Sequence, residues 1–397
     1  MAVSSRAGFT QAANALARLK ARKEASGARI LDLSSSNPSA QGLSHDPEDL
    51  ASAFGSPGNA IYRPDPRGLY AAREAVATAT GADPSSLWLC ASTSEAYGWL
   101  FKLLCDPGDS VLVPRPGYPL FDQLARLEAV KALPYDLDYI HPQGWNIDMD
   151  GLEERLSSEE GRGIRALILI NPNNPTGSYI RDVERERIIS LCLRCSLALV
   201  VDEVFFGFPL EPREGVMSFL GESRVPCFVL DGLSKRLCLP QAKLGWISLS
   251  GPPKETSRMA ESLDIIADAF LSAGTPVMNA LPSLFALEGS IKRRVSARMK
   301  ACLEIYRSVL EGGDSPHRVL RCEGGWTAMV ESPALESEED LALSLLEAED
   351  IYAHPGYFFD LDRGAHFAFS LILEEPSALR GAQGYLEHFS ALSRRLG

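Results

Sequence analysis

Short apolar segments alternate with longer helix-like segments over most of the chain. Two of the short segments, Ala166–Ile170 and Leu197–Val201, are apolar at every position. Strands of this kind are typical of a parallel sheet that helices cover on both faces. The candidate strands are Leu87–Cys90, Ser110–Val113, Ala129–Tyr135, Ala166–Ile170, Leu197–Val201, Cys227–Leu230 and Leu244–Leu249, and helix-like segments lie between them at Ser94–Leu104, Tyr118–Leu127 and Arg181–Cys195. The sequence therefore predicts an α/β fold whose large domain has a mostly parallel sheet flanked by helices.

The pattern changes after Leu249. Long helical patterns follow, and then a hairpin-like pair, a further helix, a last strand and a C-terminal helix: Lys254–Leu271, Pro276–Leu287, Ile291–Leu310, the pair around Glu323-Gly-Gly325, Glu336–Glu347 and His366–Leu371. A chain of 397 residues exceeds what one hydrophobic core usually holds. We expect a large domain over residues 50–290 and a smaller α+β domain formed by the two chain ends, residues 1–49 and 291–397.

The charge of the chain limits the partners that we expect. The formal net charge is −13 and the pI is near 5.1. Nucleic acids and anionic membranes call for a basic surface, so neither is expected as a partner. No run reaches the roughly 20 apolar residues of a spanning helix, and the N-terminal residues do not form a signal-peptide pattern. We expect a cytoplasmic protein.

The eight cysteines are scattered, mostly within apolar runs. This placement fits buried free thiols in a reducing compartment better than a disulfide framework. Cys192 and Cys195 form a C-x-x-C pair, but no second pair lies at zinc-ribbon spacing. No metal site is expected.

Three polar residues follow three of the candidate strands. Asn174 lies in the turn Asn171-Pro-Asn-Asn-Pro-Thr-Gly177, Asp202 ends the run Leu197–Val201, and Lys235 follows Cys227–Leu230. In open α/β sheets the ligand binds beyond the carboxyl ends of the strands, so all three should lie on one rim. A lysine fixed there with a lowered pKa could attack an aldehyde.

Each of these features also has a plain structural interpretation. Asp202 could cap a helix or form a structural ion pair, or it could hold the protonated nitrogen of a pyridine ring. The turn that carries Asn174 could be a rigid loop and no more. Ser92, Thr93 and Ser94 run from a strand into a helix, which suits either an ordinary helix cap or a phosphate site. No G-x-G-x-x-G or P-loop sequence is present, so a dinucleotide or a nucleoside triphosphate is not expected.

Taken in this order, the motifs resemble those of the fold-type I, class I/II aminotransferases, which use pyridoxal 5′-phosphate. The resemblance covers nearly the whole chain. It implies that Lys235 forms the Schiff base and carries the proton, and that Asp202 pairs with the pyridine nitrogen. It places Asn174 at the phenolic oxygen and Tyr118 against the ring. The residues that it places at the phosphate are Ser92, Thr93, Ser94 and Ser234.

The resemblance also implies a homodimer. Tyr62, in Tyr62-Arg-Pro-Asp-Pro-Arg-Gly68, matches a tyrosine that reaches the phosphate of the neighbouring subunit. Asn37 lies where the family's N-terminal segment passes over the substrate, and Tyr357 is a further candidate for substrate binding.

Three departures from the family pattern concern the cofactor and the substrate. Phe205 replaces a tyrosine that donates a hydrogen bond to the phenolic oxygen, which predicts a raised pKa of the cofactor's Schiff base. Lys243 replaces an arginine at the phosphate and supplies charge without the bidentate fork. Ala368 stands where an arginine usually holds the substrate carboxylate. Either another group holds that carboxylate, or the substrate is not a simple α-amino acid.

The activity that the resemblance implies is transamination from an amino acid or amine to an oxo acid. A lyase, cyclase or oxidase that uses the same cofactor is the alternative, because the fold alone does not select the reaction. A ligand-sensing regulator would need an added DNA-binding domain and a basic face, and this acidic chain favours neither.

Overall fold

The computed structural model describes residues 3–8, 14–271, 273–361 and 363–396 of the chain. Its largest sheet has eight strands in the order β2-β9-β8-β7-β6-β3-β4-β5. The strands are β2 (Leu87–Cys90), β3 (Ser110–Arg115), β4 (Lys131–Ile140), β5 (Gly144–Ile147), β6 (Ile164–Ile170), β7 (Ala198–Asp202), β8 (Cys227–Gly232) and β9 (Gly245–Ser250). The pairs that join β4, β3, β6, β7 and β8 are parallel, and β2, β5 and β9 are antiparallel to their neighbours. The prediction of a mostly parallel sheet is confirmed.

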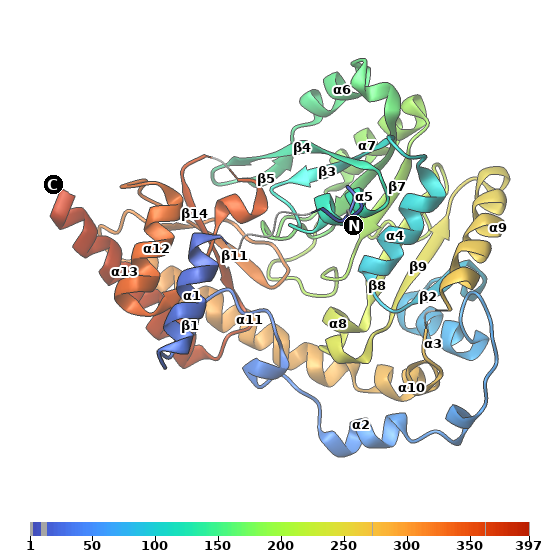
Figure 1. The fold of residues 1–397 in the computed structure, drawn as a ribbon, viewed down its shortest axis with the longest axis horizontal. Helices are drawn as coiled ribbons and strands as arrows, with labels where there is room; N and C mark the ends of the chain where they lie inside the picture. Colours follow the sequence, from blue (N-terminus) through green and yellow to red (C-terminus); the bar gives the residue numbers. More distant parts are fainter. Residues whose placement is uncertain (1–2, 9–13, 272, 362, 397) are drawn as a thin grey trace.

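Helices cover both faces of this sheet (Figure 1). Alternate residues of β6 belong to opposite cores, since Leu167 packs with α7 and α6 on one face and Ile168 packs with α4 and α9 on the other. Burial on both faces explains why these strands are continuous apolar runs. The helices of this part are α3 (Tyr70–Thr80), α4 (Thr93–Leu104), α5 (Phe121–Leu127), α6 (Met149–Ser157), α7 (Asp182–Cys195), α8 (Leu233–Arg236), α9 (Pro253–Phe270) and α10 (Thr275–Ala286).

Two predicted elements differ from the structure. The helix expected from Tyr118 begins only at Phe121, because Pro119 disfavours a helical conformation of Tyr118. The strand expected over Ala129–Tyr135 continues to Ile140 and turns into the unforeseen β5. Tyr118 therefore lies outside a helix, in the loop between β3 and α5.

The two chain ends meet in a smaller α+β part. Its antiparallel sheet has the order β10-β11-β14-β13, and β1 pairs with β12 beside it. Figure 1 shows the blue helix α1 among the red C-terminal helices, at the end of the molecule away from α9. The elements are α1 (Ala15–Ala25), β1 (Leu31–Asp32), α11 (Glu288–Leu310), β10 (Arg318–Val319), β11 (Thr327–Ser332), α12 (Glu338–Glu349), β12 (Ile351–Tyr352), β13 (His354–Pro355), β14 (Ala365–Ser370) and α13 (Glu375–Leu396). Helix α2 (Pro47–Phe54) packs against α10 of the larger part instead. A smaller α+β part built from both ends is therefore confirmed, while the boundaries at residues 50 and 290 stay a prediction.

Candidate active site

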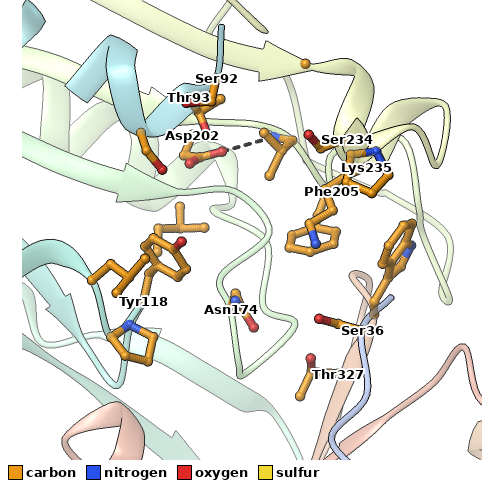
Figure 2. Close-up of a pocket in the computed structure, with 18 of the residues that line it drawn as sticks. Ser36, Ser92, Thr93, Tyr118, Asn174, Asp202, Phe205, Ser234, Lys235 and Thr327 are labelled. Atoms are coloured by element: carbon orange, nitrogen blue, oxygen red, sulfur yellow. Dashed lines mark hydrogen bonds between the residues drawn. The ribbon is translucent and has the colours of Figure 1, made fainter. Parts of the chain in front are cut away.

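A cavity of about 600 Å³ lies at the carboxyl ends of β6, β7 and β8. The last residues of these strands, Ile170, Asp202 and Gly232, all line it. The far wall comes from the small sheet and from the N-terminal segment, which contribute Thr327 and Ser36. In Figure 2, Ser92, Thr93 and Asp202 lie on one side of the cavity and Ser36 and Thr327 lie on the other. The fold thus brings residues from distant parts of the sequence to one site.

Lys235 lies in the single helical turn α8, directly after β8. Its Nζ atom is 5.1 Å from the ring centre of Trp326 and 5.5 Å from that of Phe205. Burial among these rings lowers the pKa of Lys235, and the Asp202 carboxylate opposes that shift. A lowered pKa increases the neutral fraction of the amine, which is the form that attacks a carbonyl carbon.

Asp202 ends β7 and faces the same cavity. Its Oδ2 atom accepts a hydrogen bond of 3.1 Å from the hydroxyl of Tyr97, and its Oδ1 atom accepts one of 3.2 Å from the backbone N–H of Val204, which is dashed in Figure 2. Burial raises the pKa of Asp202 to about 6, and these two hydrogen bonds limit the rise. Among the described residues no cation forms an ion pair with it, so the carboxylate is free to pair with a ligand.

The loop after β6 holds Asn174 toward the cavity. Its neighbours fix the loop: the side chain of Asn171 accepts from the N–H of Ile180 at 3.1 Å, and that of Asn173 accepts from the N–H of Thr176 at 3.2 Å. Gly177 has a φ of +72°, and a Cβ atom there would lie 2.4 Å from the sulfur of Cys322, so this position requires glycine. The amide of Asn174 lines the cavity between the two sides seen in Figure 2.

Hydroxyls and backbone N–H groups gather where α4 begins. Ser92 caps the helix, since its Oγ atom accepts from the N–H of Glu95 at 3.2 Å, and Thr93 and Ser94 form the first turn. Ser234 and Lys243 line the cavity as well. The N-terminus of a helix carries unpaired N–H groups and a partial positive charge, so this end of the cavity suits a phosphate.

Aromatic rings line the middle of the cavity. Phe205 is 7% exposed and meets Trp326 edge to face at 5.5 Å between ring centres. Tyr118 packs against Phe121 at 5.7 Å. Burial raises the pKa of Tyr118, so its hydroxyl stays protonated near neutral pH. A flat aromatic ligand would find ring faces and edges on more than one side.

Three of the residues singled out from the sequence do not line this cavity. Tyr62 is 75% exposed at the surface of the single chain. The Oδ1 atom of Asn37 accepts hydrogen bonds from the N–H and the hydroxyl of Ser39, so its side chain caps a turn. Tyr357 lies in the short helix after β13, where its backbone N–H donates to Glu338. Their roles at the cofactor or the substrate stay predictions.

Several lining residues were not foreseen, among them Ser34, Ser36, Trp326, Thr327, His354 and Ser370. Ser34 and Ser36 belong to the serine run just before Asn37, so the sequence indicated the right segment and the neighbouring side chains. His354 lies in a strand of two residues, which is too short to show any periodic pattern.

The cavity fits the cofactor that the sequence led us to expect. The start of α4 offers donors for a phosphate, and Asp202 offers a buried carboxylate without a cationic partner among the described residues. Lys235 offers an amine of lowered pKa for the aldehyde. Within the described part of the chain there is no cluster of side chains suited to a metal ion. Its helices also include none with the length and hydropathy that a bilayer span requires.

Comparison with known proteins also points to the aminotransferases that use this cofactor. The family described as "Aminotransferase class I and II" matches residues 28–371. The alanine aminotransferase of Mycobacterium tuberculosis is 26% identical over 376 residues, which are 92% of this chain and 80% of that protein. The glutamate-pyruvate aminotransferase AlaA of Haemophilus influenzae is 28% identical over 369 residues, which are 87% of each protein.

The solved structures agree on the fold. The alanine aminotransferase of Pyrococcus furiosus superposes with a TM-score of 0.84 at 22% identity, covering 99% of this chain and 100% of that one. An aminotransferase from Escherichia coli gives a TM-score of 0.85 at 21% identity and covers 98% of both chains. The relatives named here give no support to the lyase, cyclase or oxidase alternative. The chain belongs to the class I and II aminotransferases, and it is a pyridoxal 5′-phosphate-dependent enzyme that moves an amino group between small-molecule amino and oxo-acid substrates.

Proposed function

We propose that Lys235 binds the cofactor aldehyde and carries the proton during amino transfer, and that Asp202 pairs with the nitrogen of the cofactor ring. The main support is that both groups line one cavity together with the start of α4. Burial shifts both pKa values toward the neutral forms, with that of Lys235 lowered and that of Asp202 raised to about 6. Groups shifted in this way are suited to a ligand that brings an aldehyde and a protonated ring.

When bound, the cofactor supplies a protonated aromatic ring that accepts the electrons left on the substrate carbon. Lys235 holds or moves a proton at Nζ, and its lowered pKa increases the fraction of neutral amine that can accept a proton. Asp202 keeps a negative charge close to the ring nitrogen, with its two oxygens oriented by Tyr97 and Val204. An ion pair with the ring nitrogen would give this buried carboxylate the cationic partner that it lacks among the described residues.

The remaining residues hold the cofactor. The phosphate is assigned to Ser92, Thr93, Ser94, Ser234 and Lys243, which line one end of the cavity. Tyr118, Asn174 and Phe205 are assigned to the ring, and the open position of Asn174's amide supports its place at the phenolic oxygen. For the substrate we retain Asn37 and Tyr357 as candidates.

We further propose an active homodimer in the cytoplasm. Tyr62 is 75% exposed and Ile61 beside it is 49% exposed, so two neighbouring large side chains are available to contact a second copy. A tyrosine in such a segment could reach the phosphate of a second copy. The eight free cysteines fit a reducing compartment.

Chemical trapping tests the assignment of Lys235. The protein loaded with pyridoxal 5′-phosphate is treated with borohydride, digested and mapped by mass spectrometry, and we expect the label on the peptide that carries Lys235. Lys235→Ala should lose both the label and the conversion of the visible absorbance band by amines. Lys102→Ala is the matched control, because Lys102 lies on α4, pairs with Glu128 at the end of α5 and does not line the cavity. A label on another lysine of the wild type would overturn the assignment.

A further inference from the structure

The far wall of the cavity is formed by one face of the small sheet. In its register Thr327 pairs with Ser370, and Ala368 pairs with His354 on one side and with Met329 on the other. Residues two apart on a strand share a face, so Ala368 and Ser370 face the cavity together. Four of these residues, Thr327, His354, Ala368 and Ser370, line it. This wall meets the part of a substrate that lies beyond its amino group.

The far wall offers no fixed positive charge. Among the described lining residues, the side chains of Lys235 and Lys243 are the cationic ones, and the proposed function already uses both of them. His354 packs against Phe358 at 5.3 Å between ring centres, and burial lowers its pKa, so its ring is neutral near pH 7. Among the residues that the structure describes, the wall includes no arginine that could hold a carboxylate.

The wall carries neutral hydrogen-bonding groups instead. Within the described part of the chain, the hydroxyls of Ser36 and Thr327 have no hydrogen-bond partner, and both lie on the same side of the cavity in Figure 2. Ser370 Oγ accepts from the N–H of Ile372 at 3.3 Å and keeps its own proton to donate. Ser34 differs, because its hydroxyl donates to Asp32 at 2.6 Å and presents only lone pairs to a ligand.

We propose that this wall is a neutral head-group subsite, and that the preferred amino donor is a primary amine with an uncharged hydrogen-bonding group, such as a hydroxymethyl or a carboxamide, where an amino acid has its carboxylate. The inference rests on the proposed function of the cavity. An uncharged head can both donate to and accept from Ser36, Thr327, Ser370 and His354.

A carboxylate at the same place would find fewer suitable hydrogen-bond partners than an uncharged head group. It only accepts hydrogen bonds, so Ser34 would face it with lone pairs, and no cation would offset its loss of water. A site built around hydrogen bonds to one head group discriminates strongly against a head group that leaves its polar atoms unpaired. The oxo-acid acceptor enters through the same subsite, so we expect it to bind with low affinity.

The reaction balances without an outside oxidant. An amino alcohol R–CH(NH₂)–CH₂OH becomes the hydroxyketone R–CO–CH₂OH, and the amino group and the two electrons pass to the oxo acid, which becomes an amino acid. Leu120, Trp326 and Phe359 also line the cavity, so the group R can be apolar.

Matched donors test the proposal on the wild-type holoenzyme. L-Phenylalaninol and L-phenylalaninamide are compared with L-phenylalanine, and L-alaninol with L-alanine, by the rate at which each changes the visible absorbance band. We expect kcat/KM for the neutral donors to exceed that for the matching amino acid by about tenfold or more. A preference for the amino acid would overturn the proposal.

An added arginine should reverse the preference. In Ala368→Arg the ratio of neutral donor to amino acid should fall by about tenfold or more, and KM for pyruvate should fall as well. Ala368→Met has similar bulk without charge and should leave the ratio within about threefold. Because Ala368 is 3% exposed and the variant could fail to fold, Ser36→Arg with Ser36→Gln as its control repeats the test at an exposed position. Unchanged ratios in both folded arginine variants would contradict the subsite.

Binding gives a readout that does not depend on turnover. The unreactive carboxylate 3-phenylpropionate, titrated into the holoenzyme by calorimetry, should bind the wild type at least about tenfold more weakly than it binds the Ala368→Arg or Ser36→Arg variant. Equal or tighter binding to the wild type would mean that a cation reaches the wall from elsewhere. Loss of that binding in Arg63→Ala would then point to the segment beside Tyr62 and overturn the neutral subsite.

Failure of the proposed function and failure of the neutral subsite give different results. If neither amines nor amino acids change the visible band, the proposed roles of Lys235 and Asp202 fail. If amino acids change it faster than the matched neutral donors, transamination stands and only the neutral subsite is wrong.

Discussion

The amine of Lys235 lies 5.5 Å from the centre of the Phe205 ring, and Phe205 in turn meets Trp326 edge to face. Phe205 stands where the family has a hydrogen-bonding tyrosine. Here it forms an apolar pair with Trp326, and both rings lie beside the amine of Lys235. This pair excludes water from the amine and contributes to the burial that lowers the pKa of Lys235.

Restoring the tyrosine should change the titration of the cofactor. We expect Phe205→Tyr to lower the pH midpoint of the visible absorbance band of the loaded protein by about one unit, because the new hydroxyl can donate to the deprotonated form. A spectrophotometric titration of both proteins measures the shift. Phe205→Leu adds no donor and serves as the control. An equal midpoint in the wild type and Phe205→Tyr would show that the hydroxyl does not reach the phenolic oxygen.

Replacing Asp202 should stabilise the protein without cofactor and reduce the activity of the protein with cofactor. With its pKa raised to about 6, the carboxylate is charged and desolvated at pH 7.5. Asp202→Asn removes that charge, so the unloaded variant should gain about 1 to 2 kcal/mol in the free energy of unfolding, measured with urea. The loaded variant should lose about 100-fold or more in kcat, because no negative charge keeps the ring nitrogen protonated.

Tyr97→Phe is the control for this prediction. It keeps the Asp202 carboxylate and removes one hydrogen bond to it, so its loss of activity should be far smaller. Equal losses in the two variants would show that the charge of Asp202 is not what the reaction needs.

The sequence predicted the central sheet and the rim of polar residues well, for a physical reason. Strands buried on both faces, such as β6 and β7, must be apolar at every position, and a polar residue directly after such a strand stands out. Residues on short or irregular elements gave no such signal. Trp326 precedes β11 and His354 lies in the two-residue strand β13, and only the pairing of β11, β13 and β14 brings them to the cavity. The sequence indicated the segment around Asn37, but Asn37 caps a turn while Ser36 lines the cavity.

Glu203 should make the stability of the protein depend on pH. Its side chain points away from Asp202's cavity and accepts hydrogen bonds from Phe219 N–H at 2.9 Å and from the amide of Asn171 at 3.3 Å. Burial raises its pKa to about 7, well above that of an unfolded chain. Stability from a raised pKa is fully present below the unfolded pKa near 4.5 and is lost as the pH rises through about 7.

Glu203→Gln should remove this dependence. We expect Tm of the variant and the wild type to be similar near pH 5, and that of the variant to be higher at pH 8, where the charged carboxylate costs up to about 3 kcal/mol. Ser218 can turn its hydroxyl to accept from the new amide, so the hydrogen bonds need not be lost. Thermal unfolding between pH 5 and pH 8 measures the difference. A constant gap in Tm would mean that Glu203 does not titrate in this range.

Mixed dimers test whether Tyr62 completes the site of a second copy. Tyr62 is 75% exposed in the single chain and does not line its own cavity. Tyr62→Ala should weaken cofactor binding enough to leave its homodimer inactive at limiting pyridoxal 5′-phosphate, and Lys235→Ala should abolish activity. When the two inactive variants are unfolded and refolded together, each mixed dimer regains one complete site, because the subunit with an intact Lys235 receives Tyr62 from the other. Activity should therefore reappear on mixing, at about one quarter of the wild-type level with random pairing.

Refolding each variant alone provides the control, and its activity should stay at background. Size-exclusion chromatography with light scattering shows whether the refolded material is dimeric. If the mixture forms dimers without regaining activity, Tyr62 does not act across the interface. If Tyr62→Ala alone binds the cofactor as tightly as the wild type, the phosphate is held entirely by the groups at the start of α4 and by Ser234 and Lys243.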